Sequence, residues 1–209
     1  HEKLDGRRAI VVGFGTIGRA LAEVLRRQNV HVHVTDRSVP TLVTAREKGF
    51  LVGDDLPELI ARVKPRFIFS CAEPGAVGNE ALAAITSDCV LVSLTSRDVA
   101  FDKRALAKLA PGRAHGNVGT LHHRADADCD ILLVADGFPI NFHFAESMPN
   151  QQADLIMASL LVGAITLACD RPAWPAGNDP ARANAVLNDG TLLEDFLGLV
   201  PAITPRGLR

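Results

Sequence analysis

Strand-like and helix-like segments alternate through the first two thirds of this chain, and this alternation constrains the fold more than any other feature. Short runs rich in β-branched and aliphatic residues are the expected strands, at residues 9–14, 30–36, 50–53, 67–72 and 89–94. Apolar residues at helical spacing follow these runs, at residues 16–28, 41–49, 56–64, 79–85 and 102–110. Such alternation predicts an α/β fold in which right-handed crossovers build a parallel sheet covered by helices on both faces.

Three glycines form a GxGxxG motif between the first expected strand and the first expected helix. In a dinucleotide site, Gly13 would permit the tight turn and Gly15 would let the backbone approach a pyrophosphate. Gly18 would let the helix pack closely on the strand. The alternative is a glycine turn that only shapes the fold. The strand–turn–helix context favours a dinucleotide site in a Rossmann-type doubly wound parallel sheet.

The residues around this motif indicate which dinucleotide is bound. The backbone amides of Thr16 and Ile17 open the helix, so we expect them to point at the phosphates together with the positive end of the helix dipole. Asp36 ends the second strand, roughly 20 residues after the motif, where an acidic residue binds the adenosine ribose. Its carboxylate would repel a 2′-phosphate, which favours NAD. Arg37 and Ser38 keep NADP open as the less favoured alternative, because both can serve a 2′-phosphate.

The pattern changes after Pro111. Residues 129–142, CDILLVADGFPINF, are expected to form a C-terminal β-hairpin of two short strands around an Asp136–Gly137 turn, because Asp-Gly readily adopts positive φ. A long helix is expected to start near Pro149. It carries an uncharged segment, 155–168, that is apolar on nearly every face, as in a fully buried helix or a subunit interface. A homodimer is therefore expected.

Prolines are frequent in the tail from Arg171, which is expected to form loops with short helices. The predicted organisation is an NAD-binding Rossmann domain over residues 1–170, followed by a C-terminal loop and helix extension over residues 171–209.

Three segments carry a family resemblance. The stretch GFGTIGRA, followed by VTD at the end of the next strand, resembles the nicotinamide-binding domain of S-adenosylhomocysteine hydrolases, which have a GYGxVGKG turn and a VTE strand end. LLVADGFPINF at Leu132–Phe142 resembles the LLAEGRxVNL segment of that family. CVLVSLTSRDVAFD resembles its NIGHFDxEID region. The resemblance extends from about Leu4 to Ala168.

The resemblance implies further cofactor contacts. Ser70, Cys71 and Ala72 match a turn that lies beside the cofactor in the family. Ser93 matches the asparagine of NIGH, and Asn141 matches the asparagine placed near the nicotinamide carboxamide. The chain departs from the family where Ser96 replaces the histidine of NIGH and where the downstream histidine of the family has no clear equivalent.

The catalytic Asp, Lys and Asn of the hydrolases belong to a substrate domain that precedes the matched region, and this chain does not contain them. The chain also has no Tyr. We therefore expect a fragment of a longer protein or a stand-alone relative with other chemistry. The leading hypothesis is an NAD-dependent oxidoreductase, or its cofactor-binding domain, that transfers hydride to or from a small substrate. The alternatives are a non-catalytic NAD-binding module that regulates or supports a larger protein, and a hydrolase-like lyase that uses NAD transiently.

Candidates for catalysis are few. His143 follows Asn141 closely and is the better candidate for a general acid than His115, although a structural histidine is the favoured interpretation of both. Glu146 and Ser147 are candidate substrate contacts. Cys71 lacks an activating base nearby in the sequence and is expected to pack under the cofactor rather than act as a nucleophile.

No metal site is predicted. His122 and His123, followed by Asp126, Asp128 and Asp130, have ligand chemistry, but adjacent residues of a strand point to opposite faces. A polar loop before the hairpin is the favoured interpretation.

Composition excludes several classes of function. The formal net charge is −2 and there is no block of Lys and Arg, which argues against nucleic acid or an anionic membrane as the main partner. The four cysteines are far apart, which is typical of reduced thiols in the cytoplasm. The apolar segment 155–168 is shorter than the roughly 20 residues that span a bilayer, and the polar start HEKLDGRR does not resemble a signal peptide.

Overall fold

A computed structural model describes residues 4–72, 74–95, 100–140, 143, 150–169, 181–182 and 185. The chain forms two compact units, residues 1–145 and residues 146–209. Most of the described residues belong to the first unit. The domain boundary expected at residue 170 stays a prediction.

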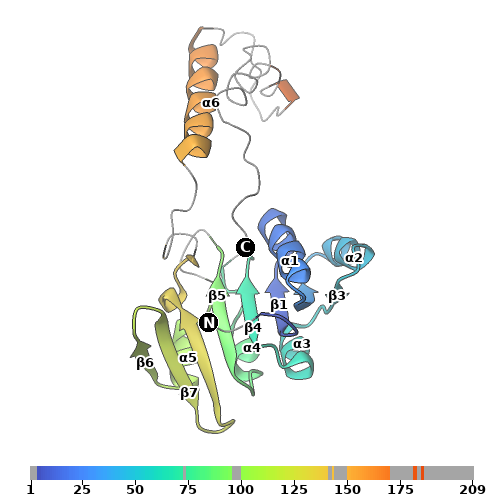
Figure 1. Cartoon of the computed structure of the whole chain (residues 1–209), viewed down its shortest axis with the longest axis vertical. Helices are drawn as coiled ribbons and strands as arrows, with labels where there is room; N and C mark the ends of the chain where they lie inside the picture. Colours follow the sequence, from blue (N-terminus) through green and yellow to red (C-terminus); the bar gives the residue numbers. More distant parts are fainter. Residues whose placement is uncertain are drawn as a thin grey trace. The chain divides into compact units, whose positions relative to one another are not determined.

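A mixed sheet forms the centre of the first unit (Figure 1). Its order is β3-β2-β1-β4-β5-β8-β7-β6. The strands are β1 (Arg8–Val12), β2 (His31–Thr35), β3 (Leu51–Val52), β4 (Phe67–Ser70), β5 (Cys89–Ser93), β6 (Gly112–His115), β7 (Gly119–Arg124) and β8 (Cys129–Val134). Neighbours from β3 to β8 pair in parallel, whereas β7 pairs antiparallel with both β8 and β6. The order 3-2-1-4-5 followed by one more parallel strand is that of the Rossmann fold, so the predicted fold class is confirmed.

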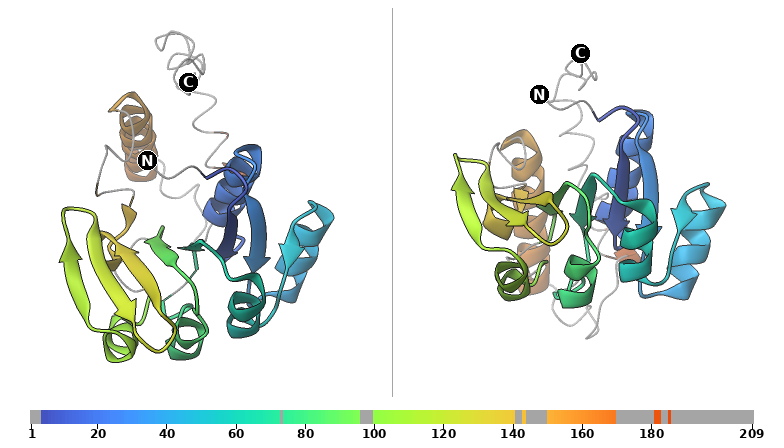
Figure 2. Two further views of the ribbon diagram at one scale, coloured as in Figure 1. Left: turned by 60° about the horizontal axis from the view of Figure 1, so that its bottom comes forward. Right: turned by 90° about the horizontal axis from the view of Figure 1, so that it is seen from below.

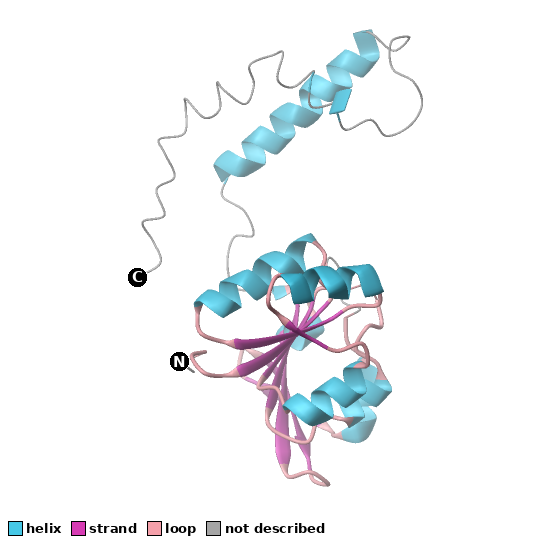
Figure 3. Ribbon diagram, turned by 90° about the vertical axis from the view of Figure 1, so that its right-hand side faces the viewer, coloured by secondary structure: helices cyan, strands magenta, loops and turns pink. Residues whose placement is uncertain are grey.

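Helices cover both faces of this sheet, as Figure 3 shows. Their bounds are α1 (Thr16–Arg27), α2 (Val39–Glu47), α3 (Leu56–Val63), α4 (Asn79–Ala83) and α5 (Lys103–Leu109). One buried cluster joins α1 and α2 to strand residues such as Ala9 and Val11. The other joins α3, α4 and α5 to residues such as Ile10 and Val12. Successive residues of β1 therefore face opposite helical layers, and the near-continuous apolar strands follow from burial on both faces.

Local sequence signals explain where several helices start. The Asp55 carboxylate accepts a hydrogen bond from the Glu58 amide at 2.7 Å and caps α3, and Asp102 caps α5 by accepting from the Ala105 amide at 2.9 Å. These caps satisfy amides that have no partner inside the helix.

The hairpin predicted around Asp136–Gly137 is wrong. Residues Ala135–Gly137 form a 3₁₀ turn at the end of β8, and Phe138–Ile140 do not form a second strand. The antiparallel strands come earlier in the chain: β6, β7 and β8 form successive hairpins at the edge of the sheet opposite α2 (Figure 2). Half of β7 is His-His-Arg, which is why its sequence predicts a polar loop. Two of these polar side chains, His122 and Arg124, are buried in the structure.

In the second unit, the predicted long helix is confirmed as α6, Asn150–Cys169. Among its described side chains are exposed large apolar ones, namely Ile156, Met157, Leu160, Leu161 and Ile165. No helix within the described part of the chain is long and apolar enough to cross a membrane.

Candidate functional site

The three glycines of the GxGxxG motif have different surroundings. Gly13 adopts φ +91°, and a Cβ there would come within 3.0 Å of Ala72. A Cβ on Gly18 would overlap the carbonyl oxygen of Gly13. Around Gly15, in contrast, no heavy atom lies within 4 Å of a built Cβ, and its φ of −70° suits any residue. The fold therefore requires glycine at positions 13 and 18, whereas at Gly15 it leaves open space beside the backbone.

The start of α1 lies at this open position. Gly15 is the N-cap residue and makes no side-chain capping hydrogen bond to the helix. The first-turn amides of an α-helix, here those of Thr16 and Ile17, have no acceptor within the helix. The amides and the positive end of the helix dipole make this end of α1 suited to an anion.

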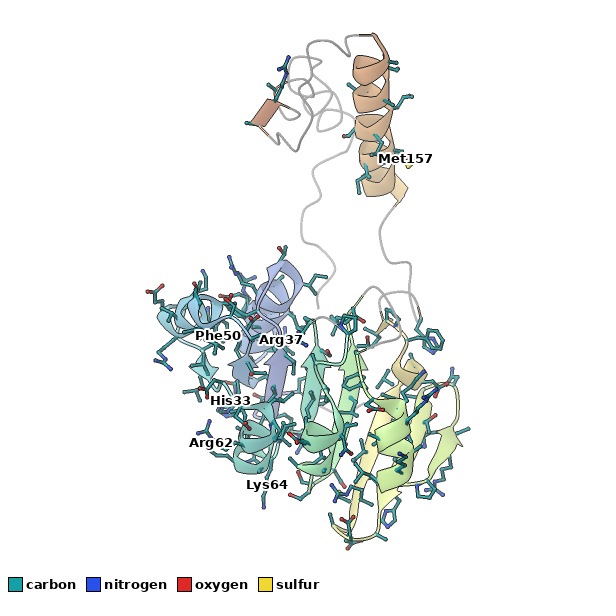
Figure 4. All side chains as sticks on the ribbon, turned by 180° about the vertical axis from the view of Figure 1, so that it is seen from behind. His33, Arg37, Phe50, Arg62, Lys64 and Met157 are labelled. Carbon is teal, nitrogen blue, oxygen red and sulfur yellow. The ribbon has the colours of Figure 1, made fainter. Side chains whose placement is uncertain are left out.

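Asp36 ties the end of β2 to the glycine turn. Its Oδ2 accepts a hydrogen bond from the Phe14 amide at 2.8 Å, and its Oδ1 accepts one from the Ser38 amide at 2.8 Å. Each carboxylate oxygen can accept a second hydrogen bond, so the half-buried carboxylate can still bind hydroxyl groups. Arg37, labelled in Figure 4, directly follows it.

A cleft of about 500 Å³ lies at the carboxyl ends of β1, β2 and β4. Its lining residues are Val12, Gly13, Gly15, Thr35, Asp36, Arg37, Ser38, Asp54, Leu56, Cys71, Ala72 and Ala76. The strand order reverses between β1 and β4, and open α/β sheets bind ligands at such a switch point. Asp54 is not among the predicted site residues, although it lies just after the short strand β3 and so follows the same rule.

The strands β1, β4 and β5 end level with one another. Val12, Ser70 and Ser93 lie in register across β1, β4 and β5. The Ser70 hydroxyl is fully buried and has no hydrogen-bond partner among the described residues, whereas the Ser93 hydroxyl pairs with Thr95 at 3.0 Å. Burial raises the pKa of the Cys71 thiol to about 12, so this group is a neutral thiol at neutral pH. A neutral thiol is a poor nucleophile.

His143 lies at a different place. It lines a hollow of about 440 Å³ together with residues of the β6–β7 hairpin and with Asp136. Its Nε2 lies 3.5 Å from the carbonyl oxygen of Asn117. Of the other predicted site residues, Ser96, Asn141, Glu146 and Ser147 lie outside the described residues.

The turn after β8 is strained. Ala135 and Asp136 both have φ of +53°, in the left-handed region that costs a non-glycine residue energy. The Thr120 hydroxyl donates to the Asp136 carboxylate, and Lys103 Nζ donates to the Asp136 carbonyl at 3.3 Å. Strain of this kind often accumulates near functional sites. From the sequence, Asp136 is predicted only as a hairpin residue.

The two adjacent histidines point to opposite faces of β7, as expected. The buried His122 bonds through Nδ1 to the Ala110 carbonyl at 2.8 Å, and the exposed His123 bonds to Asp130 at 2.9 Å. His115 is exposed on β6. Within the described ranges, no group of three or more His, Cys, Asp or Glu residues could hold a metal ion.

Arg124 of β7 is a buried charged residue that is hydrogen-bonded to the protein. Its guanidinium donates to the carbonyls of Ala83 at 2.8 Å and Ile85 at 2.7 Å and also pairs with the exposed Asp126. The hydrogen bond and charge of Asp126 raise the pKa of Arg124, and the same pairing lowers the pKa of Asp126. These polar residues bond mainly to the protein itself.

Comparison with known proteins gives relatives of several kinds. An uncharacterised protein of Mycobacterium tuberculosis is 27% identical over 199 residues, which cover 94% of this chain and 36% of that protein. An adenosylhomocysteinase of Thermococcus kodakarensis is 25% identical over 153 residues, which cover 73% of this chain and 36% of that protein. The chain thus spans about a third of the length of these curated relatives. The second relative confirms the resemblance to S-adenosylhomocysteine hydrolases.

A solved structure supports the fold. The A chain of dipicolinate synthase from Bacillus subtilis matches with a TM-score of 0.53 and 18% identity, covering 79% of this chain and 47% of that chain. At the level of sequence, residues 1–118 match the family described as D-isomer specific 2-hydroxyacid dehydrogenase, NAD binding domain. These residues are more than half of the chain and include the glycine turn, Asp36 and the ends of β4 and β5. The chain belongs to this family of NAD-binding domains.

Proposed function

We propose that this chain is the cofactor domain of an NAD-dependent oxidoreductase and that it presents the nicotinamide ring to a small substrate for hydride transfer. The observation that carries the proposal is the open space at Gly15. The fold explains Gly13 and Gly18, and the uncrowded Gly15 at the start of α1 leaves room for a ligand against the backbone. A pyrophosphate fits this position because it needs both close backbone approach and free amides.

In this proposal the adenosine half of NAD lies along the end of β2. The amides of Thr16 and Ile17 would bind the pyrophosphate, and the Asp36 carboxylate would accept hydrogen bonds from the ribose hydroxyls. The two backbone amides that already bond to Asp36 fix its orientation without neutralising its charge. A 2′-phosphate would meet this charge, so NAD is favoured over NADP, unless Arg37 and Ser38 accommodate the phosphate.

The nicotinamide half would lie toward the ends of β4 and β5. The buried and unpartnered Ser70 hydroxyl is a hydrogen-bonding group that the described protein leaves unsatisfied, which is costly unless a ligand or water bonds to it. Cys71 and Ala72 would pack against the cofactor and exclude water. Ser93 and Asn141 are the proposed contacts farther along the cofactor. NAD supplies the hydride acceptor, and these residues would hold its orientation.

Hydride transfer from an alcohol or amine also needs a proton acceptor. His143 is our candidate, in the hollow that it shares with Asp136 and Thr120. Glu146 and Ser147 are proposed substrate contacts. We further propose a cytoplasmic homodimer in which the exposed apolar residues of α6 are covered at the subunit interface.

A non-catalytic NAD-binding module is the second candidate function. One observation favours it: among the described residues that line the glycine-turn cleft, none is a His, Lys or Tyr that could exchange protons readily at neutral pH. Exchange of bound NAD with NADH and turnover of a substrate would favour the oxidoreductase. Stoichiometric NAD that does not turn over with any substrate would favour the module.

The first experiment is thermal unfolding with NAD, NADH, NADP or NADPH. A nucleotide at 100 times its Kd stabilises the folded state by about 2.7 kcal/mol, which is a shift of several degrees in Tm. We expect this shift with NAD and NADH and a smaller one with NADP and NADPH. A preference for the NADP forms would place Arg37 and Ser38 at the ribose. A chain that responds to no nucleotide, and carries none after purification, would contradict the proposal.

A further inference from the structure

Basic side chains line a hollow of about 650 Å³ at the amino ends of the parallel strands, the opposite end from the glycine turn. Its lining residues are Gly6, Arg7, Arg8, His31, Lys64, Arg66, Ser87 and Asp88. We propose that this hollow, termed the amino-edge site, binds a small molecule that carries two or more phosphate groups. The proposal concerns a second ligand and does not depend on the function proposed for the NAD cleft.

The strand pairing gathers these charges. Arg8 is the first residue of β1 and lies in register with His31, the first residue of β2. The Arg66 amide, just before β4, donates to the Arg8 carbonyl at 2.9 Å, and the His31 amide donates to the Arg7 carbonyl at 2.8 Å. Because of this pairing, three neighbouring strands start with a basic residue at nearly the same level. Adjacent strands are about 4.8 Å apart, so these residues are close together. Lys64 joins them from the end of α3 (Figure 4).

The row brings like charges close together. Arg8 and Arg66 lie on neighbouring strands, and like charges in such positions repel each other. The end of α3 carries a partial negative charge that favours Lys64. An anion bound among these cations would offset their mutual repulsion, which supports a binding role for the row.

The composition of the site identifies the kind of anion. Arg7, Arg8, Lys64 and Arg66 have basic side chains, and Asp88 is the one carboxylate among the described lining residues. The whole chain, in contrast, has a formal net charge of −2. Arginine is suited to phosphate because its planar guanidinium donates two parallel hydrogen bonds to two oxygens.

The size of the site favours a small molecule. Pockets for small ligands have volumes of roughly 300–1,000 Å³, and the amino-edge site lies within this range. An acidic protein partner would more commonly bind a broad, flatter surface. Several cations around one hollow match a ligand with two or three phosphate groups better than a single carboxylate.

The test is calorimetric titration of inorganic tripolyphosphate into the chain with and without NAD, so that binding at the amino-edge site is distinguished from binding at the glycine turn. Arg8→Gln and Lys64→Gln remove one cation each from the amino-edge site. Arg104→Gln is the matched control, because Arg104 is an exposed arginine of α5 that does not line the site. Thermal unfolding of each variant checks that it is folded.

We expect one tripolyphosphate per chain, with binding weakened about tenfold by Arg8→Gln or Lys64→Gln and unchanged by Arg104→Gln. Asp88→Asn should strengthen binding, since it removes the opposing charge. Equal binding by all variants, or loss of binding once NAD is present, would overturn the amino-edge site. A hexaglutamate peptide that binds more tightly than tripolyphosphate would overturn the assignment to phosphates.

Discussion

The glycine turn and strand β7 are both rich in residues that invite a functional interpretation, but they use their polar groups in opposite ways. At the glycine turn three of the six residues are glycine, and the backbone around Gly15 faces open space. In β7 the side chains are large and polar, and the buried His122 and Arg124 bond to backbone carbonyls of Ala110, Ala83 and Ile85. A candidate binding site is therefore better recognised by unused hydrogen-bonding capacity than by the number of polar side chains.

The largest expected effect separates two glycines of the same turn. Gly18→Ala places a Cβ where it overlaps the Gly13 carbonyl, so we expect destabilisation by about 3 kcal/mol or more and loss of NAD binding with it. Gly15→Ala should change the free energy of unfolding by no more than about 1 kcal/mol, because its φ suits alanine and nothing crowds the added methyl.

Urea unfolding of the two variants, with and without NAD, tests this pair. Gly15→Ala should weaken NAD binding by at least about tenfold, or 1.4 kcal/mol, while the unliganded protein stays folded. If Gly15→Ala binds NAD as tightly as the parent chain, the pyrophosphate does not lie against Gly15. The interpretation of the glycine turn as the binding region would then be wrong.

The second effect tests the opposite claim for β7. Arg124→Met keeps much of the side-chain volume but leaves the carbonyls of Ala83 and Ile85 without their donor. We expect destabilisation by about 2–3 kcal/mol, since each buried acceptor loses a charged hydrogen bond, and an unchanged affinity for NAD. Arg104→Met, on the exposed face of α5, should stay within about 0.5 kcal/mol of the parent.

Chemical unfolding measures the stability, and nucleotide titration of the folded variant measures the affinity. If Arg124→Met is fully folded and still binds NAD more weakly than the parent chain, β7 contributes to the site. The distinction between a binding region and a structural region would then be wrong.

The sequence predicts the first region far better than the second. Gly13, Gly18 and Asp36 act within a short strand–turn–helix unit, so their spacing is enough to locate the cleft. Strand β7 depends on partners that are distant in the sequence: Arg124 reaches carbonyls about 40 positions away, and this contact is what allows a polar segment to be buried. Hydrophobic periodicity depends only on neighbouring residues and does not indicate such a contact. For this reason the pattern predicts a loop where the structure has a strand.

The turn after β8 and the amino-edge site were missed for related reasons. Asp-Gly predicts positive φ but not its use, and at Asp136 the strained turn ends a parallel strand instead of joining two antiparallel ones. Arg8, His31 and Arg66 are far apart in the chain, and only the strand register brings them together. Motifs predict sites formed by contiguous residues, and register predicts sites formed across strands.

The smallest expected effect is that of removing Asp126, the exposed partner of Arg124. The hydrogen bond from Arg124 lowers the pKa of Asp126 below its ordinary value of 3.8. A carboxyl whose pKa is lower in the folded state contributes stability above its ordinary pKa, and this contribution is lost as the pH falls through the lowered value.

Asp126 is fully exposed, so solvent screens the pair and the contribution should be small. Asp126→Asn should therefore reduce stability only slightly at pH 7 and flatten the dependence of the unfolding free energy on pH as the pH falls below the ordinary carboxyl value of 3.8. Urea unfolding across this range, with Asp128→Asn as the control in the same turn, measures the difference. If Asp126→Asn costs as much as Arg124→Met, the ion pair rather than the two carbonyls holds the guanidinium, and β7 owes its burial to a surface charge.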